Sequence, residues 1–157
     1  VYLLGQVAGY AVLKEDRSIR FPFEGYSDIR ETACHLYTDL GALEAFPLLV
    51  TILRQDPDPT MKAVAVGCLT RLQSDPDRSA EELLERLCTQ DAERGPDDRL
   101  ALETVAALET YAHYHGALTA AGIRTLLAVS RGPYTPAVRA RARDVIRNLS
   151  NPDSEKE

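Results

Sequence analysis

The 157-residue sequence has no tryptophan, three phenylalanines and three cysteines. Cys34, Cys68 and Cys88 are far apart in the sequence and show no C-x-x-C spacing. An odd, unpaired set of cysteines is typical of a reducing compartment and favours a cytoplasmic location. Cys68 and Cys88 fall on apolar helix faces, so we expect them to be small core residues.

Recognisable catalytic motifs are also missing. There is no glycine-rich phosphate loop, no G-x-S-x-G and no H-E-x-x-H. His113 and His115 would diverge by about 200° on a helix, so they cannot share a metal ion. No acid or nucleophile is placed in the sequence to work with His35. We therefore expect no catalytic residue, no metal site and no cofactor.

No apolar run is long enough to span a bilayer, because the longest candidate covers only residues 1–14. That run lacks the basic start and the cleavage site of a signal peptide, and we expect it to be a helix, truncated at its start. The first residue is valine rather than methionine, which indicates a piece of a longer chain. The net charge of −6 and the pI of about 5.1 argue against nucleic-acid binding, which requires a basic surface.

The sequence does contain a helical apolar period, clearest in residues 41–72. Leu49, Val50 and Leu53 belong to one apolar face, and the run 56–59 (DPDP) ends that helix. Pro59 is suited to open the next helix with Asp58 as its N-cap. This stretch therefore predicts two antiparallel helices joined by a short turn.

The same period predicts further helices, and Leu69 and Ile146 are expected on core faces. A capping box of Ser79 and Glu82 is expected to start one of them. Residues 15–26 form either a recognition loop with exposed aromatics or a cap over the end of the core. The predicted further helices cover residues 1–14, 29–40, 79–90, 99–115, 117–130 and 136–149, with a loop at 91–98 and a polar tail at 151–157.

A short pattern recurs along the chain, with starts at Ile29, Met61, Leu100 and Val138. In three copies an aliphatic residue precedes a basic one, and alanine follows three residues later, as in Met61-Lys62 with Ala65. With the preceding aspartate- and proline-containing turn, this pattern resembles the HEAT repeat family. The third copy departs from it, with Ala101 in place of the basic residue. The resemblance implies an all-α fold, an α-α superhelix (HEAT-like solenoid) of about four antiparallel helix pairs in one domain, residues 1–150.

The resemblance also implies a function, because HEAT-like arrays are scaffolds whose second helices line a concave face. We expect a non-catalytic module that binds a protein or peptide. The alternative is a HEAT-like enzyme such as a bilin lyase-type protein, although no residue specifically indicates one. The residues expected near the binding face are Arg30, Glu31, His35, Lys62, Arg71, Glu103, Arg139 and Arg143.

Arg139, Arg143 and Arg147 recur every fourth residue and form a stripe on the last helix. Such a stripe could hold phosphates, or it could be a solvated face with salt bridges. In HEAT-like arrays the residue at the position of Arg139 commonly pairs with a turn aspartate such as Asp58. The resemblance therefore implies that Arg139 forms an ion pair that links neighbouring repeats. We favour that role and expect no nucleic-acid partner.

Overall fold

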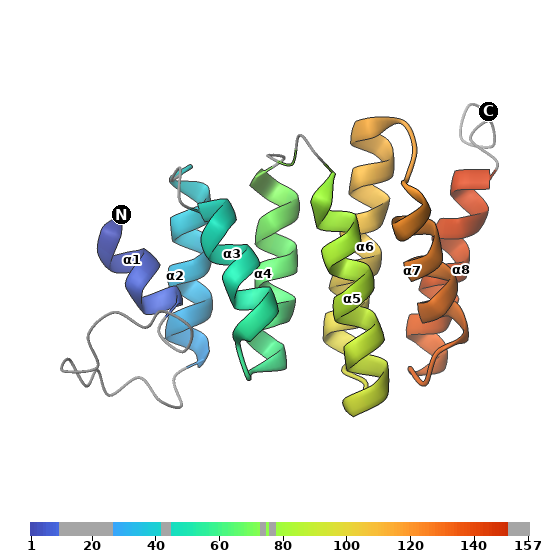
Figure 1. The fold of residues 1–157 in the computed structure, drawn as a ribbon, viewed down its shortest axis with the longest axis horizontal. Helices are drawn as coiled ribbons and strands as arrows, with labels where there is room; N and C mark the ends of the chain where they lie inside the picture. Colours follow the sequence, from blue (N-terminus) through green and yellow to red (C-terminus); the bar gives the residue numbers. More distant parts are fainter. Residues whose placement is uncertain (10–26, 42–44, 73–74, 76–77, 151–157) are drawn as a thin grey trace. The chain divides into compact units, whose positions relative to one another are not determined.

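The structure is a computed structural model that describes residues 1–9, 27–41, 45–72, 75 and 78–150. Within these ranges all regular structure is helical, in eight helices and no strand, which confirms the predicted all-α class (Figure 1). No helix of this described part has the length and apolarity needed to cross a bilayer. The predictions for the 15–26 loop and the 151–157 tail concern positions outside the described residues.

The described residues group into two compact units, Val1–Ser74 (unit 1) and Asp75–Glu157 (unit 2). Unit 1 contains four helices: α1 (Tyr2–Ala8), α2 (Ser27–Asp39), α3 (Ala45–Gln55) and α4 (Pro59–Leu72). Helix α2 packs against both α1 and α4, and α3 packs against α4. The close approach of α1 and α2 depends on Gly5, since a Cβ there would lie 3.0 Å from the Tyr37 ring.

The α3–α4 turn forms as its prolines and aspartates predict. Helix α3 ends at Gln55, α4 begins at Pro59, and the Asp58 carboxylate accepts a hydrogen bond from the Thr60 amide at 2.9 Å. Helix α4 then places apolar side chains on several sides, and only Pro59 and Arg71 in it are exposed. The core of unit 1 is therefore centred on α4. Its largest fully buried side chains are Leu49, Ile52, Leu53, Met61 and Leu69.

Unit 2 contains α5 (Ser79–Arg94), α6 (Asp98–His115), α7 (Ala120–Arg131) and α8 (Pro136–Ser150). The chain reverses direction between successive helices, so α5 and α6 form one antiparallel pair and α7 and α8 another (Figure 1). The pairs pack in register, with α5 against α7 and α6 against α8. The core side chains include Leu84, Leu100, Val105, Leu108 and Leu126.

Three local predictions for unit 2 are wrong. Helix α5 starts under a different cap, because Asp75 accepts the amides of Ser79 (3.0 Å) and Ala80 (2.7 Å) while Glu82 is exposed. It also continues to Arg94, since the chain turns at Gly95, whose φ of +148° suits glycine, and not at residue 91. Ile146 is only half-buried, because Val145 takes the interior position beside it.

Replacing Leu69 by alanine should destabilise the protein by about 2–5 kcal/mol, because its side chain is 2% exposed and would leave a cavity. The matched control is Leu102→Ala, which removes the same atoms from a side chain that is 41% exposed. Urea denaturation followed by circular dichroism measures both. Equal losses for the two variants would show that α4 does not present Leu69 to the core.

Candidate functional site

The eight residues expected on a binding face differ widely in exposure. In unit 1 Arg30 is buried, Glu31, His35 and Lys62 are half-buried, and only Arg71 is exposed. In unit 2 Glu103 and Arg139 are half-buried and Arg143 is exposed. The structure brings two of the eight into contact, since Arg71 Nη2 lies 2.7 Å from His35 Nδ1. Whether these residues contact a partner stays a prediction.

Arg30 is not available to a partner, which corrects its expected place on the binding face. Its side chain is 8% exposed and forms an ion pair with the fully buried carboxylate of Asp56. The same guanidinium donates a hydrogen bond to the Ala8 carbonyl at 3.2 Å. Arg30 therefore joins α1, α2 and the α3–α4 turn.

Arg30, and not Arg139, forms an ion pair with a turn aspartate, and that aspartate is Asp56 rather than Asp58. Within the described residues no ion pair involves Arg139 or Arg143, whereas Arg141 pairs with Glu109 and Arg147 with Asp144. Two of the four arginines on α8 are therefore neutralised by neighbouring acids. The other two are left for solvent or a partner.

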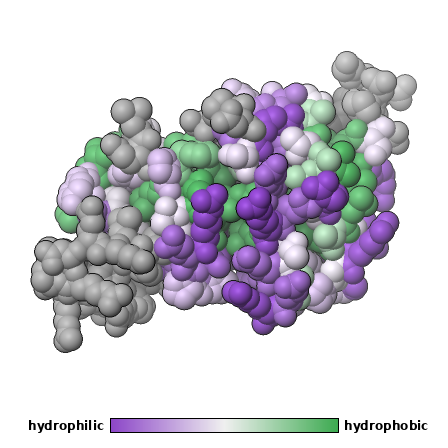
Figure 2. Space-filling model, viewed as in Figure 1, coloured by the Kyte–Doolittle hydropathy of each residue, from purple (hydrophilic) through white to green (hydrophobic). Residues whose placement is uncertain are grey.

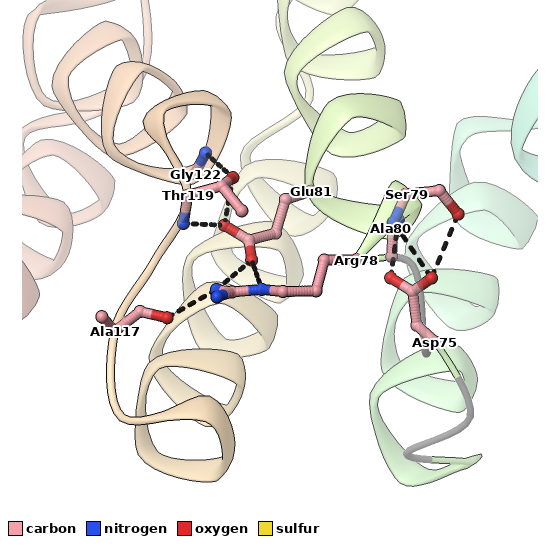
Figure 3. A network of polar contacts seen from close by, with 8 residues as sticks. All are labelled: Asp75, Arg78, Ser79, Ala80, Glu81, Ala117, Thr119 and Gly122. Carbon is pink, nitrogen blue, oxygen red and sulfur yellow. Dashed lines mark hydrogen bonds and ion pairs between the residues drawn. The ribbon is translucent and has the colours of Figure 1, made fainter.

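Glu81 is the most buried acidic side chain of unit 2, and Figure 3 shows how it is held. One carboxylate oxygen accepts from Arg78 Nε (3.0 Å) and Nη2 (2.6 Å). The other accepts from the Thr119 amide (2.8 Å) and hydroxyl (2.7 Å) at the start of α7. Gly122 leaves room for this carboxylate, because a Cβ at residue 122 would collide with it.

The partners of Glu81 assign it a structural role. Both oxygens are occupied by donors of the same unit, and Arg78 donates a further bond to the Ala117 carbonyl at 2.5 Å. A negative charge beside the first amides of α7 is also favoured by the helix dipole. The network therefore fastens α5 to the start of α7 and offers no free acid or base.

A different cluster lies between α2 and α4, and the sequence did not reveal it. The Sγ atoms of Cys34 and Cys68 are 3.8 Å apart, and Cys68 Sγ lies 3.4 Å from His35 Nδ1. Arg71 Nη2 donates to Cys68 Sγ at 3.3 Å. The thiols are buried, while Arg71 reaches the surface. The expectation that His35 has no nucleophile beside it is wrong.

The two thiols of this cluster have opposite electrostatic environments. The hydrogen bond from Cys34, with Thr38, His35 and Arg71, lowers the pKa of Cys68 to about 6 despite its burial. The same bond and burial raise the pKa of Cys34, since its thiol supplies the proton. His35 and Arg71 both contact Cys68, so Cys68 is the thiol whose ionised form its neighbours favour. Local spacing gave no sign of it, except that Cys68 and Arg71 are three residues apart on one helix.

An apolar groove lies between α1 and α2 in unit 1. Its volume is about 360 Å³, and Asp28 is the one charged residue in its lining. Leu36 in the lining is 47% exposed, and Leu40, four residues further along the chain, is 59% exposed. Figure 2 shows hydrophobic residues at the surface of α1 and mainly hydrophilic ones over α5. The groove is lined by Leu3, Leu4, Val7, Asp28, Ile29, Thr32, Ala33 and Leu36.

No protein-family model matches the chain, and no curated protein or solved structure matches it either. In the part of the chain that the structure describes, no three histidine, cysteine or acidic side chains are grouped to hold a metal ion.

Glu81→Ala should destabilise the protein by about 3–5 kcal/mol, because it leaves the partly buried Arg78 without its counter-charge and the α7 amide without an acceptor. The adjacent Glu82→Ala is the matched control, since it removes an exposed ion pair with Arg86 and should cost under about 1 kcal/mol. Urea denaturation measures both. A similar loss for the two variants would contradict the structural role of Glu81.

Proposed function

We propose that the chain is a HEAT-like helical repeat that acts as a non-catalytic protein-interaction scaffold. In this proposal unit 1 receives an apolar helical segment of a partner protein in the α1–α2 groove. The observation that carries the proposal is the exposed apolar surface around the groove. Contiguous exposed apolar surface on a protein marks interaction sites, and an amphipathic helix fits an apolar groove.

The distribution of exposed apolar side chains supports this location. Of the nine large apolar side chains that are exposed in the described residues, six lie in α1 or α2 or directly next to one of these helices. The other three are scattered over α6 and α7. Single exposed side chains are normal, so the concentration in unit 1 is the informative feature. The six are Val1, Tyr2, Leu3, Ile29, Leu36 and Leu40.

Charge specifies the partner further. Helix α1 has no charged residue, and the acids of α2 are Asp28, Glu31 and Asp39. The only arginine of α2, Arg30, is buried in its ion pair with Asp56. The groove therefore has one charge in its lining, the negative charge of Asp28. It suits a helix with an apolar face and lysine or arginine at its flanks.

A designed helical peptide with a leucine face and lysine flanks should bind unit 1. In an NMR titration we expect the amides of α1 and α2 to shift, and the affinity to fall when the flanking lysines are replaced by glutamates. Leu36→Glu should abolish binding, because it places a charge in the groove. Ile123→Glu is the matched control, since Ile123 is 50% exposed in unit 2.

Three results would contradict the groove proposal. The first is binding that Leu36→Glu leaves unchanged, or shifts confined to unit 2. The second is self-association of the wild type that Leu36→Glu removes, which would make a second copy the occupant. The third is peptide binding only after Phe21 and Phe23 are replaced by serine, which would make the chain's own 10–26 segment the occupant.

The same proposal predicts no appreciable affinity for duplex DNA at physiological salt. The chain is acidic, and only Arg139 and Arg143 of the α8 arginines are without an ion pair in the described residues. Fluorescence anisotropy with a labelled duplex measures this. Tight binding that falls steeply with salt and is lost in the Arg139→Glu, Arg143→Glu variant would overturn the prediction.

A further inference from the structure

The thiols of Cys34 and Cys68 are in contact although they belong to different helices. Their sulfur atoms are 3.8 Å apart, and a disulfide requires about 2.05 Å. Disulfide formation therefore requires the two sulfur atoms to approach each other by about 1.8 Å. The third cysteine, Cys88, belongs to unit 2 and is buried beside Tyr134. Cys34 and Cys68 are thus the cysteines that the fold brings together.

The groups around the pair make its two members unequal. The charged or titratable side chains near the thiols are His35, Arg30 and Asp39 on α2 and Arg71 on α4. Helix α3 also packs against α4, and its one charged residue is the exposed Arg54. Arg71 donates to Cys68 and not to Cys34. A positive group beside a thiol favours the thiolate, which is the nucleophilic form.

Among the side chains that contact Cys68, Arg71 reaches the surface. Arg71 is 46% exposed, and its ion pair with Asp39 is long, at 3.6 Å. Exposed ion pairs of this kind contribute little, so Asp39 does little to hold Arg71 in place. Cys68 is itself buried, so its reaction with a small molecule requires Arg71 or a neighbouring group to move.

We propose that Cys34 and Cys68 are a reversible redox site that reacts with small hydroperoxides. The Cys68 thiolate attacks the peroxide and forms an S–O bond while the O–O bond breaks, giving a sulfenic acid and releasing hydroxide or alkoxide. Cys34 then attacks the Cys68 sulfur, an S–S bond forms, and the sulfenic oxygen leaves as water with the Cys34 proton. Two equivalents of a small thiol then reduce the protein disulfide by two successive exchanges and leave as their own disulfide.

Hydrogen peroxide is the first probe, applied to the folded chain in the Cys88→Ala background. Peptide mass spectrometry should find a Cys34–Cys68 disulfide, which dithiothreitol reverses. With Cys34→Ala, dimedone should trap a sulfenic acid on Cys68. With Cys68→Ala, Cys34 should stay unmodified. Labelling of Cys34 in that last variant, or reaction of either thiol only in denaturant, would overturn the proposal.

The role of Arg71 gives a second readout that a purely structural pair would not show. The rate of iodoacetamide labelling at Cys68 should rise with pH, and the midpoint of that rise should lie well below the pKa of about 8.5 of a free thiol. Arg71→Leu should move that midpoint upward, and Arg71→Lys should restore it in part. Because Arg71 is exposed, neither variant should change the circular dichroism. A midpoint at the free-thiol value in the parent protein, or one that Arg71→Leu does not shift, would contradict the assignment of Cys68 as the thiolate.

Discussion

The buried ion pair between Arg30 and Asp56 sets the arrangement of unit 1. One guanidinium reaches the end of α1 through the Ala8 carbonyl and the α3–α4 turn through Asp56. The second oxygen of Asp56 accepts the Asp58 amide at 3.0 Å, so the same carboxylate shapes the turn. Breaking one partner of such a pair leaves an uncompensated buried charge, which is strongly destabilising. The register of α2 against its neighbours depends on this contact.

Both proposed sites of unit 1 use helix α2. Ile29 and Leu36 line the groove with α1, whereas Cys34 and Thr38 are buried, with Cys34 in contact with α4. A disulfide between Cys34 and Cys68 would draw α2 toward α4 and alter the wall of the groove. Because one helix carries both surfaces, we expect thiol oxidation and partner binding to influence each other. The coupling would be reciprocal, as any coupling between two binding equilibria must be.

The sequence predicted the helices well because their signals are local. The helical spacing of apolar residues and the prolines at 57 and 59 can be recognised from neighbouring residues alone. Helices α3, α4 and α8 begin or end close to where these signals place them. The predictions that failed depend on a choice between two neighbouring residues or on a contact between residues far apart in the sequence. Asp75 displaced Ser79 as the cap of α5, and Val145 displaced Ile146 from the core. The contact of Cys34 with Cys68 joins residues 34 apart in the chain, and no local period encodes it.

The Glu81 network affects when unit 2 can fold during synthesis of the chain. A ribosome releases the chain from its N-terminus, so α5 emerges well before Thr119, which supplies two of the donors to Glu81. Until then the Glu81 carboxylate has only Arg78, and burying it would be costly. The α5–α6 hairpin should therefore remain hydrated and loosely packed during synthesis, and unit 2 should become protease-resistant only once α7 has left the exit tunnel.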